Sequence, residues 1–294
     1  MRSASTWLIG GAVAVLLAIA IADAIRSRTD ASASQPPARQ LPGLHGVLVV
    51  ADQRCRTSSF RLPSMARAQP AHPLDCGGLV WSDDGSLVAR CAGDRTAVRS
   101  GDGKILFADI RGCPPAWRAD GALSVVRNGD IVVVRRHGPQ LSFYTHEQLA
   151  DALGSLVERP ATYVFSEVRW FGLSSFVAIV HGQRPWETAA VVFARGGLES
   201  FFPVLGGHIE DLQASPLGNF AFARTVPARE YVMVSRGGDE MRLPGIANAR
   251  AIAWSPDESR VAIATRNAVF IARLGSAQPS NRLSIGAAAL DWLP

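Results

Sequence analysis

The sequence is poor in lysine and in catalytic motifs. Lys104 is the single lysine among 30 basic residues, and the arginines that supply the net charge of +5 are scattered. Without a basic run of about five residues, no nucleic-acid partner is expected. There is also no P-loop, no G-x-S-x-G elbow, no H-E-x-x-H and no G-x-G-x-x-G before a helix. We therefore predict no catalytic residue, cofactor or metal site.

Charged residues are few as well, at 19%, whereas 48% of the residues are hydrophobic. This composition excludes a chain that is disordered throughout, because enough apolar surface is available to form a packed core. A length of 294 residues suits one large domain or two small ones.

The N-terminal region contains the longest uncharged apolar run, WLIGGAVAVLLAIAIA at residues 7–22. Counted on to Ile25, the segment has nineteen residues with Asp23 as its one charge. A helix of nineteen residues just crosses a hydrocarbon layer of ~30 Å. We predict that residues 1–26 form a signal anchor. The alternative is a signal peptide cleaved after the small residues of 20–22 or 22–24. Residues 27–43 are rich in Ser, Ala and Pro and are expected to form a flexible linker.

The charges around this segment conflict with export. Arg2 precedes it and Arg26 and Arg28 follow it, so the positive-inside rule would leave the rest of the chain in the cytoplasm. The even number of cysteines, which suggests disulfides, favours export instead. We therefore predict that the domain lies on the extracytoplasmic side of the membrane, or is secreted if the segment is cleaved. Small residues at every fourth position allow weak helix dimerisation, although an alanine-rich helix produces such a stripe by chance. They are Gly10, Ala14, Ala18 and Ala22.

From His45 onward, short runs of Val, Ile, Ala and Phe alternate with Gly, Asp, Asn and Pro, which is typical of an all-β domain. One phrase, an aromatic residue followed by a polar turn and a second apolar run, recurs roughly every 40 residues, the length of a four-stranded propeller blade. Its anchor positions are Trp81, Trp117, Trp170, Ala214, Trp254 and Trp292.

The turn within each repeat has the chemistry of a type I turn. Ser255-Pro256-Asp257 places Ser, Pro and Asp where such turns prefer them, and residues 82–85 and 118–121 keep Asp and Gly. We therefore interpret Asp83-Asp84-Gly85 as a turn and not as a cation site. The tryptophan ahead of each turn is expected to pack between neighbouring blades.

The phrases AWSPDESRVAIA, VWSDDGSLVARC and AWRADGALSVV resemble the W-S-P-D-G repeats of TolB-like, or WD40-like, bacterial β-propellers. The resemblance covers residues 44–294 and implies a propeller of a family that includes interaction modules and the non-catalytic propellers of certain peptidases. The chain departs from the pattern at Glu258, which replaces Gly, at Phe171-Gly172 and at Ala214.

The two ends of the domain complement each other. ALDWLP at 289–294 supplies a first strand with no blade behind it, and residues 46–63 supply two strands without a first strand. We predict six blades, with seven as the alternative count, and one blade made from both termini. Residues 145–158, with Thr145 and Gln148 at capping-box spacing and Leu149, Leu153 and Leu156 on one face, predict a helix inserted in the second blade. This helix either packs on the blade or lies near a binding face.

Four cysteines in a chain with an export signal suggest two disulfides. Of the three pairings, we favour Cys55 with Cys76 and Cys91 with Cys113, since each closes a short loop. A zinc site is the rival interpretation, but no C-x-x-C spacing is present.

Two polar clusters fall between expected strands, where propeller loops border a face or the channel. They are either solvated loop residues or part of a ligand or partner surface. The first contains His208, Glu210 and Asp211, and the second contains His181, Arg184 and Glu187.

Together these features predict a membrane-anchored, extracytoplasmic β-propeller that binds an unidentified envelope protein or small ligand without catalysing a reaction. The alternative is an enzyme or metal-binding propeller with its site at one end of the central channel.

Overall fold

The computed structural model describes residues 41–294, apart from 42, 70–72, 83, 135–140, 185, 195, 205–208 and 226–228. The anchor predicted at residues 1–26 and its stripe of small residues lie outside the described part of the chain. Within the described part, no helix is both long enough and apolar enough to span a membrane.

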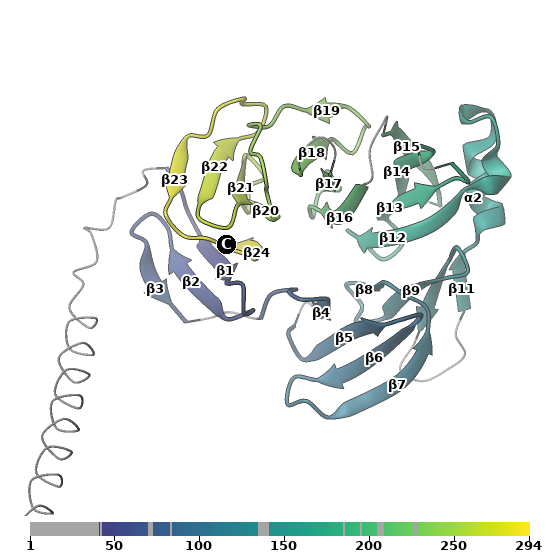
Figure 1. Ribbon diagram of the computed structural model, residues 1–294, viewed down its shortest axis with the longest axis horizontal. Helices are drawn as coiled ribbons and strands as arrows, with labels where there is room; N and C mark the ends of the chain where they lie inside the picture. Colours follow the sequence, from purple (N-terminus) through teal and green to yellow (C-terminus); the bar gives the residue numbers. More distant parts are fainter. Residues whose placement is uncertain are drawn as a thin grey trace, which may run out of the picture. The chain divides into compact units, whose positions relative to one another are not determined.

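The described residues form six antiparallel sheets of four strands each, which confirms the predicted six-bladed β-propeller. Figure 1 shows the sheets arranged around a common centre, with the first strand of each blade innermost. Five sheets contain four consecutive strands in sequence order, and the sixth combines strands from both ends of the domain.

The strand bounds follow the repeats. Blade one consists of β4 (Leu79–Trp81), β5 (Leu87–Ala92), β6 (Arg95–Ser100) and β7 (Ile105–Arg111). Blade two consists of β8 (Pro115–Trp117), β9 (Leu123–Arg127), β10 (Asp130–Val134) and β11 (Leu141–Tyr144). Blade three consists of β12 (Val164–Trp170), β13 (Phe176–His181), β14 (Thr188–Ala194) and β15 (Gly197–Pro203). Blade four consists of β16 (Ile209–Ala214), β17 (Phe220–Arg224), β18 (Glu230–Val234) and β19 (Glu240–Met241). Blade five consists of β20 (Ala251–Trp254), β21 (Arg260–Ala264), β22 (Val269–Arg273) and β23 (Asn281–Leu283). Blade six consists of β24 (Ala289–Leu293), β1 (Val47–Ala51), β2 (Thr57–Arg61) and β3 (Ala66–Ala68).

The ring closes through the sixth blade. Strand β24 pairs antiparallel with β1, with Val47 opposite Leu293 and Ala51 opposite Ala289. The last strand of the sequence thus becomes the innermost strand of the blade that begins the domain. This pairing removes the free edges that β1 and β24 would each expose in an open array.

Most blades bury both faces of their middle strands against neighbouring blades, which explains their continuous apolar runs. Every residue of β14 is buried, and so are five of the six residues of β13. The first blade is the exception, because its two middle strands, β5 and β6, bury only two residues each. Its apolar link to the sixth blade is also small, with Val49, Ala51 and Leu74 as the buried members of the cluster.

Tryptophans at the ends of first strands join successive blades. Trp117 Nε1 donates a hydrogen bond of 2.9 Å to the Val80 carbonyl oxygen of the first blade. Trp170 Nε1 likewise donates to Ser124 Oγ of the second blade at 2.7 Å. Each indole therefore fixes its own blade to the preceding one through both apolar contact and a directed bond.

The remaining anchor tryptophans have different surroundings. Trp254 and Trp292 are buried, and Trp292 Nε1 donates to the His45 carbonyl oxygen at 2.8 Å, ahead of β1. Trp81 is half-buried and borders a central cavity. The repeated tryptophan thus contributes to blade packing or to the wall of the channel.

The Ser-Asp turns are held by side-chain hydrogen bonds. Ser255 Oγ donates to Asp257 Oδ1 at 2.6 Å and accepts from the Arg260 backbone N–H at 3.0 Å. Asp257 also accepts from the hydroxyl and the N–H of Ser259, and these bonds, that from Ser255 foremost, lower its pKa to about 2. The aspartate is thus a structural part of the turn.

Glu258 explains one departure from the repeat. It occupies a left-handed conformation (φ 50°), where glycine is the usual residue. Its carboxylate is buried and accepts from the backbone N–H of Leu217 at 2.9 Å and from Asn219 Nδ2 at 3.0 Å. Glu258 therefore connects its own turn to the corresponding turn of the fourth blade.

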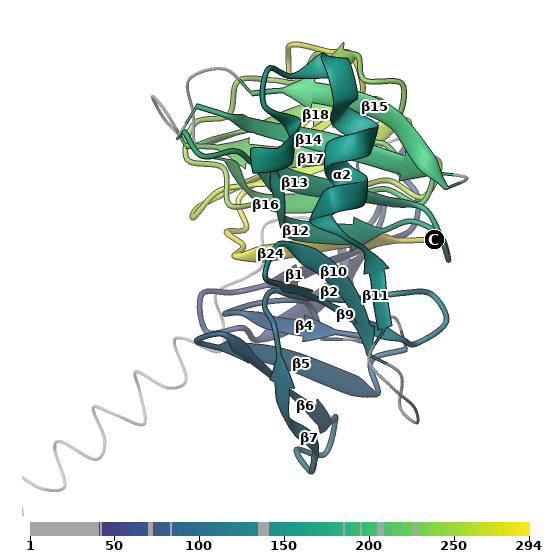
Figure 2. The same cartoon turned by 90° about the vertical axis from the view of Figure 1, so that its right-hand side faces the viewer.

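The predicted helix is present, but it does not lie inside the second blade. Helix α2 (His146–Leu153) follows β11, the last strand of that blade, and leads through the 3-10 helices η1 (Gly154–Leu156) and η2 (Pro160–Thr162) to the third blade. The expected capping box between Thr145 and Gln148 is formed. Leu149 and Leu153 are buried in the cluster of the third blade, which α2 covers in Figure 2. Leu156 is exposed instead, because the α-helix ends before it.

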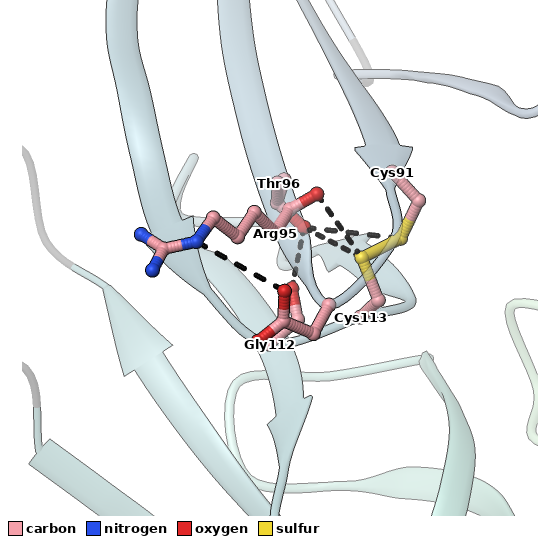
Figure 3. The surroundings of a disulfide bond; sticks show 6 residues. Cys91, Arg95, Thr96, Gly112 and Cys113 are labelled. Carbon is pink, nitrogen blue, oxygen red and sulfur yellow. Dashed lines mark hydrogen bonds and ion pairs between the residues drawn. A yellow bond between two sulfur atoms is a disulfide. The ribbon is translucent and has the colours of Figure 1, made fainter.

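Two disulfides link the first blade to its neighbours on both sides. Cys55, in the turn between β1 and β2, is bonded to Cys76 just before β4, and Cys91 in β5 is bonded to Cys113 just before β8. This is the local pairing that the sequence favoured. Figure 3 shows the second bond beside the buried Thr96, which donates to the Gly112 carbonyl oxygen at 2.7 Å. A loop of this length contributes about 3 kcal/mol, which offsets the small apolar contact of this blade.

We predict that Glu258→Gly destabilises the protein although it restores the usual turn residue. The substitution relieves the left-handed backbone but leaves the Leu217 N–H and the Asn219 amide without their acceptor. Since bonds to charged groups are the stronger ones, we expect a net loss of about 1–3 kcal/mol in the free energy of unfolding, measured by urea denaturation. An unchanged or more stable variant would contradict the bridging role.

Candidate functional site

The first polar cluster lies on an inner strand and not in a loop as predicted. Glu210 and Asp211 are in β16, at a bulge where the pairing with β17 shifts register, and Asp211 is left-handed (φ 56°). His208 lies outside the described residues. The bulge turns Asp211 toward the channel and toward the side chains of β18.

A hydrogen-bonded network surrounds Asp211. Its carboxylate accepts from Arg229 Nη2 at 2.8 Å, from the Tyr231 hydroxyl and from Gln213 Nε2 at 3.0 Å. Arg229 Nε also donates to Glu210 at 2.9 Å. Burial and the adjacent Asp211 carboxylate raise the pKa of Tyr231 well above its ordinary value. Burial opposes the charge of Arg229, but its neighbours outweigh that effect and raise its pKa. Asp211 is therefore held in place as an acceptor.

Asp211 borders a central cavity of about 470 Å³ that five blades share. Its charged lining residues are Asp75 before β4, Arg169 in β12, Asp211 in β16, Arg250 before β20 and Asp291 in β24. Three carboxylates and two guanidiniums thus face one volume from different blades. Such a lining suits a polar ligand or a partner's loop that carries both donors and acceptors.

The carboxylates of the cavity already accept hydrogen bonds from other groups of the propeller. Asp75 Oδ1 accepts from the backbone N–H of Trp81, and Asp291 Oδ1 accepts from the backbone N–H of Trp292, both at 2.7 Å. Across the described residues, no three His, Cys, Asp or Glu side chains are close enough to hold a metal ion together. The lining thus presents both charged donors and charged acceptors to the cavity.

Glu167 lies behind the cavity wall and is mostly buried, with 16% of its side chain exposed. It forms an ion pair of 3.0 Å with Arg169 and accepts a 3.3 Å hydrogen bond from the Leu212 N–H. Burial raises its pKa, and the charges of Asp211 and Glu210 add to this, while Arg169 opposes it. The sequence did not single out Glu167, Arg169, Arg229 or Tyr231.

The second polar cluster lies at the hairpin between β13 and β14. His181 Nδ1 and Thr188 Oγ1 are 2.9 Å apart, and Glu187 forms a 2.5 Å ion pair with Arg159 of the helical insertion. The N–H of Arg184, which donates to Glu187 at 3.0 Å, and the Arg159 guanidinium lower the pKa of Glu187. The hairpin is thereby fixed to the insertion.

This hairpin borders a surface hollow of about 410 Å³. Trp186 and Leu156 line it and are 60% and 57% exposed, and the guanidinium of Arg184 lies 5.6 Å from the centre of the Trp186 ring. The two clusters therefore belong to different cavities, one at the centre of the ring and one beside the helical insertion.

Glu167→Gln tests the electrostatics of the central network. Because the pKa of Glu167 is raised in the folded state, its contribution to stability falls as pH rises above the unfolded value of 4.5. Glutamine keeps an acceptor for Leu212 but does not titrate. We expect the unfolding free energy of the variant, relative to the unmodified chain, to increase between about pH 4 and pH 7. A difference that stays constant across urea titrations in this window would refute the assignment.

The fold is shared with solved structures of low sequence similarity. The β-propeller domain of Cps50 (Swd1) from Myceliophteria thermophila is 13% identical, with 87% of this chain and 93% of that chain covered and a TM-score of 0.52. The Dos1 propeller is 12% identical, with 85% and 75% covered and a TM-score of 0.47. No protein-family model and no curated protein matches the chain. The likeness to Cps50 supports the β-propeller fold, and the TolB-like assignment stays a prediction.

Proposed function

We propose that the chain is a membrane-anchored, extracytoplasmic protein-interaction module, and that the hollow beside Trp186 is its main docking site. The exposure of Trp186 carries this proposal. Large apolar side chains that border one hollow are typical of interaction surfaces, and tryptophan and arginine are enriched among the residues that dominate binding energies. Here Trp186, Leu156 and Arg184 meet these criteria together.

The position of the hollow supports the same conclusion. One wall comes from Leu156 at the end of η1 and from residues 157–159, which precede η2. They belong to the segment between the second and third blades that the repeat does not contain. The Glu187 to Arg159 ion pair fixes the opposite wall to this segment. A preorganised hollow reduces the ordering cost of association, which favours a binding function for the insertion.

The alternative, an enzyme or metal-binding propeller, would use the central cavity. The carboxylates of Asp75, Asp211 and Asp291 line it from three blades. Each of them already accepts hydrogen bonds inside the propeller. Asp75 accepts from Trp81, Asp211 from Arg229 and Tyr231, and Asp291 from Trp292. For this reason we favour recognition over catalysis at the channel.

Membrane attachment and export are supported by two separate features. The uncharged run at residues 7–22 has the composition of a membrane segment. The described domain contains two disulfides and no free cysteine, and disulfides persist in oxidising compartments outside the cytoplasm. An exported propeller on a short linker would present its hollow to other envelope proteins.

Photocrosslinking tests the docking site. Trp186 is replaced by p-benzoylphenylalanine in the full-length chain, and Leu217, which is 65% exposed on a turn of the fourth blade, is replaced in a matched control. We expect a discrete covalent adduct in envelope membranes from position 186 and a much weaker one from position 217. Arg184→Ala should reduce the adduct, since it removes a charged lining residue of the hollow that is available to a partner. Equal labelling from both positions would remove this hollow from consideration.

Thiol labelling tests the compartment. When the full-length chain is expressed in a bacterial host and its thiols are trapped at lysis, we expect no reaction with a maleimide-polyethylene glycol reagent before reduction and four labelled thiols after it. A chain that lacks residues 1–26 should remain inside the cell with its thiols reduced. Four free thiols in the full-length chain would contradict export.

A further inference from the structure

A second cavity, distinct from the hollow at Trp186, separates the first and second blades. It has a volume of about 430 Å³, and its apolar walls include Leu87 and Phe107 from the first blade and Trp117, Leu123 and Val134 from the second. Of these five residues, only Leu123 is fully buried, so the space between the blades is incompletely filled. We call this cavity the interblade groove.

The groove lies at one end of the junction between the first and second blades, and a disulfide links the blades at the other end of this junction. Leu87 begins β5 and Trp117 ends β8, whereas Cys91 lies toward the end of β5 and Cys113 just before β8. The disulfide therefore holds the blades together at the end remote from the turns. At the turn end, Asp84 and Asp120 are exposed at the rim.

The next junction of the ring shows what fills the corresponding space. There the guanidinium of Arg118 lies 5.0 Å from the Trp170 ring centre and 5.3 Å from that of Phe143. The same guanidinium forms a 3.2 Å ion pair with Asp120. This junction thus has an arginine that packs on two aromatic rings, with a carboxylate of the turn beside it.

The interblade groove repeats most of this arrangement but lacks the arginine. Trp117 and Asp84 occupy the repeat positions of Trp170 and Asp120, but the position of Arg118 is taken by Ser82. Phe107 is not at the repeat position of Phe143, but it also lies on the outer strand of its blade and supplies the second aromatic wall. The short Ser82 side chain is engaged within its own turn, since its hydroxyl donates to Asp84 and accepts from the Leu87 N–H. Ser82 therefore cannot place a cation over Trp117.

We propose that the interblade groove binds an arginine side chain of a partner protein, in a segment where an apolar residue adjoins that arginine. The guanidinium would lie over Trp117 and Phe107 and face Asp84, as Arg118 does at the next junction. The adjoining apolar side chain would contact Leu87, Leu123 and Val134. Asp84 is suited to this role because hydrogen bonds from Ser82 and Ser86 lower its pKa to about 2, so it is charged at neutral pH.

The chain offers a matched control for Asp84. Asp257 holds the corresponding turn of the fifth blade, accepts hydrogen bonds from the equivalent pair of serines and also has a pKa of about 2, but it does not border the groove. Asp84→Asn and Asp257→Asn should therefore weaken their turns alike. Only Asp84→Asn removes a carboxylate from the interblade groove, because Asp257 borders a separate, smaller cavity of about 160 Å³. Phe107→Ala tests the aromatic wall of the groove. Its control is Phe270→Ala in the fifth blade, because Phe270 is half-buried like Phe107 but does not border the groove.

The test begins with a random peptide library displayed on phage and selected on the immobilised full-length chain, with Asp84→Asn protein used for counter-selection. We expect the enriched peptides to share an arginine beside an apolar residue. A labelled peptide with this sequence should bind about tenfold more weakly when citrulline replaces arginine, when Asp84→Asn is present or when Phe107→Ala is present. Asp257→Asn and Phe270→Ala should leave its Kd unchanged, and added salt should weaken binding.

Several results would overturn the proposal. These are the absence of an arginine from the enriched peptides, equal binding of the arginine and citrulline peptides, and equal effects of Asp84→Asn and Asp257→Asn. Self-association of the chain that is lost in Asp84→Asn would identify a second copy as the occupant instead of another protein. Because Trp186 lies in a different hollow, adducts from position 186 should persist in Asp84→Asn protein, so the two sites can fail independently.

Discussion

The pairing of β24 with β1 is the constraint on which the rest of the structure depends. Each blade is a small sheet that buries its faces only when a neighbour stands on either side. A row of such sheets would leave two blades with one bare face each. By joining the last strand to the first, the chain converts the row into a ring in which every inner strand faces a shared centre, and the central cavity exists only because of this closure.

Within this ring the blades are not equivalent. The third to sixth blades hold together through large apolar clusters. The first blade buries few residues of its middle strands and has covalent links to both neighbours. The features that distinguish this protein occur where the repeat is interrupted or altered. They are the helical insertion before the third blade, Glu258 in place of glycine, the bulge at Asp211 and Arg118 in place of the serine that the repeat has at positions 82, 215 and 255.

The sequence predicts the repeated part of the molecule well. The aromatic residue, the turn and the alternating strands recur with enough regularity to indicate the number of blades and the shared sixth blade, which the structure confirms. The site is less accessible from the sequence. Glu210 and Asp211 look like loop residues because the bulge breaks their alternation, and Arg229 and Tyr231 reach Asp211 only across β17. The register of that hairpin, which sets Glu210 and Tyr231 on the same row, was the available signal. The interblade groove depends on a side chain that is small, and this becomes informative only once the junctions are superposed in space.

The two disulfides also have a consequence for the order in which the molecule assembles. Their cysteines are separated by 21 and 22 residues, all within the first half of the chain, whereas closure requires the final strand. As the chain emerges from the N-terminus, both cysteine pairs are complete long before β24 is available. The blade with the weakest packing can thus be secured to the strands on either side of it while the ring is still open, and the last residues then close a structure whose least stable sector is already fixed.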